Sequence, residues 1–173
     1  ELPNGDLLAS YSNDGGQSVT GGTDWSRSTD GGRTWRKEGL LLPLEGPGRE
    51  NFLKLSLSRD GSTIYAYGSR FTGESGGGFG ERPSEAIFCT STDGGHTWSA
   101  PQVIPMPSDL LEVSHGILAT SSGRLLAPTA TIHPSALGER VLLAISDDGG
   151  RTWPRHAVAL QDPNGELGYF EQK

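Results

Sequence analysis

Carboxylate, guanidinium and imidazole side chains gather in the Gly-rich segments between the short apolar runs of this 173-residue sequence. Side chains of these types transfer protons and bind polar or charged ligands. The spacing of His115 and His133 matches no metal-binding motif, so neither a metal site nor a cofactor is expected. The candidates for ligand contact or proton transfer are Asp14, Asp24, Arg49, Glu50, Arg70, His115, His133 and Glu171.

An eight-residue motif occurs three times and indicates that a repeated structural unit carries these side chains. A second and shorter repeat places Asn-Gly or Asp-Gly before an apolar run. This order favours a tight hairpin turn because these residues tolerate positive φ. The long motif is STDGGRTW at 28–35, STDGGHTW at 91–98 and SDDGGRTW at 146–153. The short one is NGDLLA at 4–9, DGSTIYA at 60–66 and SGRLLA at 122–127.

The long motif has a structural explanation. Its Ser and Asp side chains can accept hydrogen bonds from backbone amides of the turn, its glycines relieve the bend, and its Trp packs against the turn. A calcium loop would need more oxygen ligands than such a turn supplies. The residues assigned this structural role are Ser28, Asp30, Trp35, Ser91, Asp93, Trp98, Ser146, Asp148 and Trp153.

The sequence predicts an all-β fold, because helical periodicity is nearly absent and short β-rich runs alternate with Gly-rich turns. Repeats of about 40–60 residues favour a β-propeller of four-stranded antiparallel blades. About three blades are present in one partial domain, with blade units at roughly 1–45, 46–107 and 108–162 and the start of a further blade at 163–173. In the second blade, strands are expected at 52–58, 64–70, 86–91 and 99–104.

Alternate turns of an antiparallel blade lie at opposite ends of the sheet. The hairpins and the long-motif turns should therefore share one face, and the long loops and blade-to-blade links the other. Long loops on a rigid scaffold commonly carry function. Asp24 is expected in the first long loop, Arg82 as a solvated loop charge, and Glu85 as a cap of the third strand, whereas His115 and Glu171 should lie near the propeller axis.

Composition excludes several classes of partner. With a net charge of −7, the chain lacks the excess of positive charge that binds the phosphates of nucleic acid. No apolar run approaches the roughly 18 residues that a spanning helix needs, so no membrane span is expected. Cys89 is the single cysteine, which rules out a disulfide within the chain.

The three long motifs resemble the Asp-box (BNR) repeats of the sialidase superfamily, whose members form six-bladed propellers. The resemblance extends over the chain, from RSTDGGRTW through SHGILATSSGRLLAPTA to GYFEQK. It implies a glycoside hydrolase that acts on the ends of glycans, with sialic acid as one candidate sugar. Asp14 matches the family's acid/base Asp, with Asp24 as second choice, and Glu171 matches the Glu that ionises a Tyr nucleophile. The implied ligand is a carbohydrate, gripped through its carboxylate by arginines.

The sequence lacks Arg-Ile-Pro, the motif that supplies the family's first carboxylate-binding arginine. A non-catalytic Asp-box propeller that binds glycans or protein partners is therefore the alternative, and a purely structural repeat module is a third. The chain is expected to be a fragment of a longer propeller, with a homodimer that closes a six-bladed ring as the competing prediction. The resemblance favours a secreted or periplasmic protein, although no signal peptide precedes Glu1.

Overall fold

Twelve strands and no helix form the described part of the chain, which comprises residues 1–13, 21–46, 49–73, 80–132 and 138–169 of a computed structural model. No helix in these ranges is long and apolar enough to cross a membrane. The strands are β1 (Leu7–Ser12), β2 (Thr23–Ser28), β3 (Arg36–Leu40), β4 (Asn51–Leu57), β5 (Ile64–Phe71), β6 (Ser84–Ser91), β7 (Gln102–Ile104), β8 (Leu111–Glu112), β9 (Leu118–Ala119), β10 (Leu125–Thr131), β11 (Arg140–Ser146) and β12 (Arg155–Gln161).

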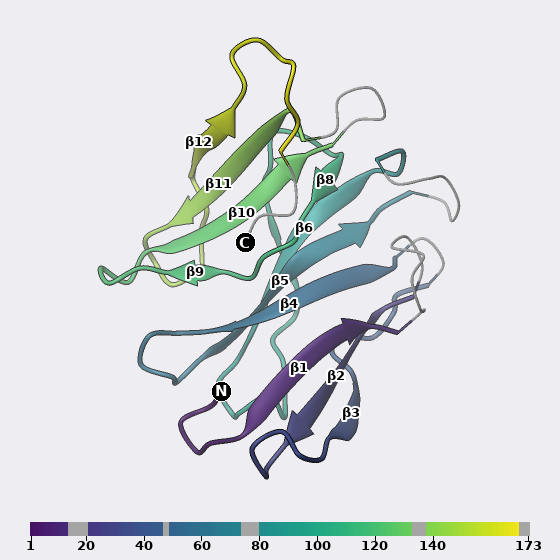
Figure 1. The fold of residues 1–173 in the computed structure, drawn as a ribbon, viewed down its shortest axis with the longest axis vertical. Helices are drawn as coiled ribbons and strands as arrows, with labels where there is room; N and C mark the ends of the chain where they lie inside the picture. The colour runs from purple at the N-terminus through teal and green to yellow at the C-terminus, as the bar shows by residue number, and fades with distance from the viewer. Residues whose placement is uncertain (14–20, 47–48, 74–79, 133–137, 170–173) are drawn as a thin grey trace.

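These strands form three antiparallel sheets that follow one another along the chain (Figure 1). The orders are β1-β2-β3, then β4-β5-β6-β7, then β12-β11-β10-β8, with β9 also paired to β10. The second sheet has the four strands that the sequence predicts, but β6 begins two residues earlier, at Ser84, and β7 begins three residues later, at Gln102. The first sheet has three strands within the described residues, so its expected fourth strand is not seen there.

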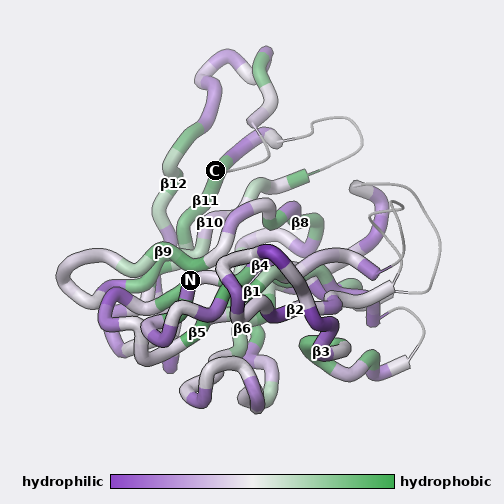
Figure 2. The backbone as a smooth tube through the Cα atoms, turned by 60° about the horizontal axis from the view of Figure 1, so that its bottom comes forward, coloured by the Kyte–Doolittle hydropathy of each residue, from purple (hydrophilic) through white to green (hydrophobic). Residues whose placement is uncertain are grey.

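The apolar core lies between neighbouring sheets. Trp25, Leu53 and Ile87 belong to the cluster between the first and second sheets, and Tyr67 and Phe88 belong to the cluster between the second and third. Figure 2 shows hydrophobic segments along β9 and β11 and hydrophilic segments in many connecting turns. Successive side chains of a strand point to opposite faces, so β5 and β6, the central strands of the second sheet, supply both clusters.

Each copy of the long motif folds into the same hydrogen-bonded turn. In the first copy, Ser28 Oγ donates to Asp30 Oδ1 (2.8 Å) and accepts from the amide of Gly32 (2.9 Å). Asp30 accepts from the amide of Thr34 (2.9 Å) and from its hydroxyl (2.6 Å). The second and third copies repeat these four bonds. The side chains at these positions therefore replace backbone partners in closing the turn.

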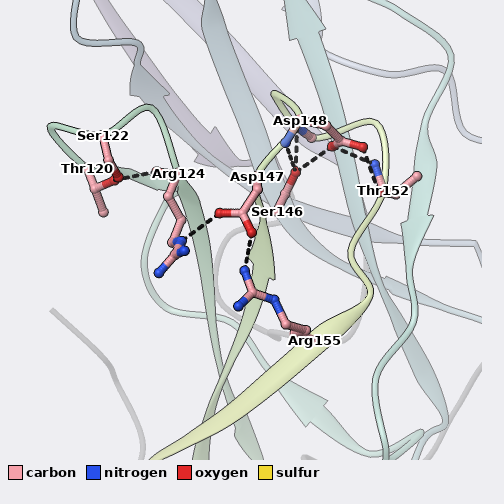
Figure 3. Close-up of polar contacts among 9 residues, drawn as sticks. Thr120, Ser122, Arg124, Ser146, Asp147, Asp148, Thr152 and Arg155 are labelled. Atoms are coloured by element: carbon pink, nitrogen blue, oxygen red, sulfur yellow. Dashed lines mark hydrogen bonds and ion pairs between the residues drawn. The ribbon is translucent and has the colours of Figure 1, made fainter.

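The third motif turn is also tied to its neighbours by Asp147 (Figure 3). Asp147 accepts from Arg124 Nε at 2.7 Å and pairs with Arg155. Arg124 directly precedes β10 and Arg155 opens β12. This carboxylate therefore links the ends of the strands on either side of β11. All three side chains are substantially exposed, so we assign the cluster a modest stabilising effect.

Trp35 bonds to its own turn, as expected, but is more exposed than the other two motif tryptophans. Its side chain is 45% exposed, whereas Trp153 is 4% exposed. Trp98 and Trp153 pack against aromatic rings of the preceding sheet. Within the described residues, no aromatic ring packs on Trp35.

Candidate functional site

Strand register brings several predicted site residues to one end of the second sheet. Asn51 pairs with Arg70, and Arg70 pairs with Glu85 on its other side. Arg49 and Glu50 directly precede Asn51, and the amide of Phe71 donates to the carbonyl of Glu50 at 2.9 Å. The antiparallel order of β4, β5 and β6 thus collects residues that are up to 36 positions apart in the sequence.

Arg70 and Arg49 converge on the carboxylate of Glu85. Arg70 Nε and Nη2 lie 2.9 and 2.6 Å from Glu85 Oε1, and Arg70 Nη1 lies 3.4 Å from Glu45. Arg49 Nη1 lies 4.0 Å from the same Glu85 oxygen. The side chain of Arg70 is 13% exposed, whereas that of Arg49 is 41% exposed. Arg70 is therefore held firmly, and Arg49 is the more accessible cation. Glu85, expected to cap a strand, instead partners these arginines from within β6.

Glu50 forms a second, more buried ion pair beside this cluster. Arg82 Nη2 lies 2.8 Å from Glu50 Oε2, and its guanidinium sits 4.1 Å from the centroid of the Phe71 ring. The Arg82 side chain is 4% exposed, so the expectation of a solvated loop charge is wrong. Stacking on an aromatic face and pairing with a carboxylate are the contacts that offset burial of a guanidinium. Phe71 in turn meets Phe52 edge to face, at 6.2 Å.

Asp24, the second choice for the acid, lies within β2 and not in the first long loop. It is 2% exposed and pairs with Lys37. The hydrogen bond to Asp24 raises the pKa of the Lys37 ammonium above its ordinary value. A buried carboxylate in a central strand with its own cation serves the fold, so the predicted loop position of Asp24 is wrong.

His115 lies in an irregular stretch of the inner edge of the third sheet. Glu112 pairs with Ala130, and Ala119 pairs with Leu125. Between these two pairs the edge of the sheet advances by seven residues, whereas β10 advances by only five. Pro128 lies in that part of β10 and has no N–H to donate, so regular pairing is interrupted between β8 and β9. Such bulges re-aim side chains. His115 Nδ1 lies 2.9 Å from the carbonyl oxygen of Gly116.

Three other predicted residues, Asp14, His133 and Glu171, lie outside the described residues. Sequence reasoning placed Arg49, Glu50, Arg70 and His115 among the site residues, gave Glu85 only the role of a strand cap, and did not single out Lys54. Pro128 within a central strand was the available signal for the bulge. Within the described ranges, no group of three or more His, Cys, Asp or Glu side chains could hold a metal ion.

No family model matches the chain. Among curated proteins it is 33% identical over 179 residues to a sialidase of Micromonospora viridifaciens, an alignment that covers 87% of this chain. The chain spans 27% of the length of that relative.

Solved structures share the fold. The intramolecular trans-sialidase of Ruminococcus gnavus superposes with a TM-score of 0.67 at 15% identity, over 95% of this chain and 60% of that one. The α-L-arabinanase of Penicillium chrysogenum gives 0.68 at 21% identity, over 95% of this chain and 49% of that one. The predicted β-propeller with about three blades is thereby confirmed. Because most of the chain also aligns with a sialidase at 33% identity, the chain belongs to the sialidase superfamily.

Proposed function

We propose that the intact protein is a sialidase-like glycoside hydrolase that acts on the ends of glycans. The observation that carries the proposal is the convergence of Arg49 and Arg70 on Glu85 at the long-loop end of the second sheet. Similarity to sialidases and to other glycan-degrading enzymes supports it. The ligand is a carbohydrate, and sialic acid is the first sugar to test.

Each proposed binding residue has a role that suits its environment. Arg49, the accessible cation, binds a substrate carboxylate or hydroxyl, and Arg70 keeps Glu85 in place beside it. Glu50 holds Arg82 against Phe71 and shapes the floor of the site. His115 and His133 form hydrogen bonds to sugar hydroxyls.

The proposed chemistry assigns Asp14 and Glu171 the catalytic roles of the family. Asp14 donates a proton to the leaving-group oxygen as the glycosidic bond breaks. Positive charge then develops on a sugar that already carries a carboxylate. A carboxylate nucleophile would be repelled by that group. The attacking group is therefore a Tyr, which is neutral until Glu171 takes the proton of its hydroxyl.

Hydrolysis of fluorogenic glycosides tests the proposal. The intact protein is assayed with the 4-methylumbelliferyl glycoside of N-acetylneuraminic acid and with the arabinose and xylose glycosides as neutral comparisons. Asp14→Asn and Glu171→Gln should each lower kcat by at least about 100-fold. Turnover that these substitutions leave unchanged would remove the residue concerned from the mechanism.

Arg49→Gln tests the binding role separately. The substitution should raise KM about tenfold for an anionic sugar, which corresponds to one charged hydrogen bond. Arg59→Gln is the matched control, because Arg59 is exposed in the β4–β5 hairpin at the other end of the sheet. Glycans that bind but are never cleaved would identify a binding module in place of an enzyme.

A further inference from the structure

A half-buried lysine on the second sheet reaches the bulged segment of the third. Lys54 lies in the middle of β4, and its ammonium group donates to the carbonyl of Val113. Two residues along β4 on the same face, Ser56 is close to Gly116: a Cβ added to Gly116 would lie 3.0 Å from the Ser56 Cβ. The inner strand of one sheet thus contacts both ends of the segment from Val113 to Gly116.

The bulged segment also has bonds of its own. Ser114 Oγ donates to Glu112 Oε1, next to the residue that Lys54 holds. Because the carbonyl of Gly116 can only accept, the proton of the bond to His115 resides on Nδ1. The neutral ring then carries its lone pair on Nε2. The backbone between Glu112 and Gly116 therefore determines which nitrogen of His115 can accept a proton or hydrogen bond.

Regular β pairing cannot hold this segment in place. Between Glu112 and Leu118 the ladder to β10 is interrupted opposite Pro128, so the backbone of residues 113–117 depends on other partners. Lys54 supplies one such partner from the neighbouring sheet. Burial lowers the pKa of the Lys54 ammonium, and the nearby Glu112 carboxylate opposes that shift.

We propose that Lys54 is a positioning residue, which fixes the bulge through the Val113 carbonyl and thereby sets the orientation and tautomer of His115. The consequence of this positioning role for ligand affinity rests on the proposed function, which assigns His115 a hydrogen bond to the sugar. The effect on His115 itself does not depend on any activity.

Side-chain nitrogen NMR of the histidines measures that effect directly. In the unmodified protein, His115 is expected as the Nδ1–H tautomer, with its signal identified by loss in His115→Gln. Lys54→Met keeps the length and apolar stem of the side chain but removes the donor and the charge. We expect it to convert His115 to a mixture of tautomers with averaged nitrogen shifts.

Two further variants separate positioning from a general loss of stability. Lys54→Arg restores a charged donor and should return His115 to the Nδ1–H tautomer, and it also serves if Lys54→Met fails to fold. Lys37→Met removes a different lysine, which pairs with Asp24 on the first sheet, and should leave His115 unchanged. An unaltered His115 tautomer in folded Lys54→Met, or an altered one in Lys54→Arg, would overturn the proposal.

Kinetics then connect the bulge with the ligand. If the intact protein cleaves a glycan, Lys54→Met should raise KM about fivefold with kcat within about twofold, as expected when a binding contact is displaced. A changed tautomer with unchanged KM would count against His115 as a ligand contact, while the glycosidase activity and the positioning role of Lys54 would both stand.

Discussion

The indole of Trp153 packs edge to face against the ring of Phe88, with centroids 5.5 Å apart and planes inclined at 76°. One sheet earlier, Trp98 meets Trp25 in the same way, at 6.4 Å and 83°. Phe88 and Trp25 each lie three residues before the serine of a long motif. The motif tryptophan of one sheet therefore packs on the ring that precedes the motif of the sheet before it, and this repeated contact helps to join the blades.

Trp153→Ala should destabilise the fold far more than Trp35→Ala. Both indoles donate to a glycine carbonyl of their own turn at 3.1 Å, so the hydrogen bond is matched and the packing differs. Loss of the buried Trp153 should lower the free energy of unfolding by about 3–5 kcal/mol, whereas loss of Trp35 should cost less than about 1 kcal/mol. Urea unfolding measures both, and equal losses would contradict the blade-joining role.

Arg27→Ala should be similarly damaging, because this guanidinium is 6% exposed and joins two sheets. Its Nη1 lies 2.7 Å from Asp6 Oδ2, and its Nη2 donates to the carbonyl of Gly94 in the next motif turn. Removal leaves the part-buried Asp6 carboxylate and the Gly94 carbonyl without this donor, which should cost about 3 kcal/mol. Arg36→Ala is the control: Arg36 is 74% exposed and pairs with Glu38, so its loss should cost less than about 1 kcal/mol in the same urea experiment.

Stability should fall as the pH drops from about 4 to about 2. Hydrogen bonds from Thr34, then from Ser28, lower the pKa of Asp30 from 3.8 to about 2, and those from Thr152 and Ser146 lower that of Asp148 to about 2. Because these folded-state pKa values lie below the unfolded one, the unfolded chain binds protons first on acidification. The stabilisation is therefore present above pH 4 and lost through pH 2.

Asp148→Asn tests this linkage, since it removes one of the titrating groups. Thermal unfolding of the variant should depend less steeply on pH between 4 and 2 than that of the unmodified protein. Between pH 6 and 8 these aspartates are ionised in both the folded and the unfolded state, so they should not make the thermal stability of either protein depend on pH. Identical acid slopes would show that the motif aspartates do not govern the acid transition.

Gly68→Ala should prevent normal pairing of β4 with β5. A Cβ at Gly68 would lie 1.7 Å from the carbonyl oxygen of Phe52, which belongs to backbone and cannot move aside cheaply. Gly73→Ala is the matched control, because its nearest neighbour would be a side-chain atom of Pro83 at 3.6 Å, an ordinary contact. Circular dichroism and yield of folded protein should show loss of structure in Gly68→Ala alone, and a well-folded variant would show that β4 can shift.

Much of the fold was accessible from sequence because its signals are local. The repeated Ser-x-Asp-Gly-Gly turn requires its own side chains and glycines, so the motif specifies the turn wherever it occurs. Short β-rich runs between such turns then predicted antiparallel strands, and the runs at 52–58 and 64–70 lie within a residue of β4 and β5.

The candidate site was less accessible because its residues meet through pairing across strands. Arg70 and Glu85 are 15 positions apart, and their contact depends on the register of β5 with β6. The sequence predicts Arg82 as a loop charge, yet it is buried because Glu50, just before β4, and Phe71, at the end of β5, contact it. Asp24 reads as a loop acid because Gly21 and Gly22 precede it, yet β2 begins one residue before it, at Thr23.

By itself, then, the sequence determined the all-β class, the three repeated turns and the resemblance to one superfamily, because short-range hydrogen bonds and φ preferences act between neighbouring residues. Only the tertiary structure decided which charges are paired, which tryptophans are covered and that Lys54 meets the bulge before His115. Those outcomes depend on strand register and on the packing of one sheet against the next, which join residues that no local pattern connects.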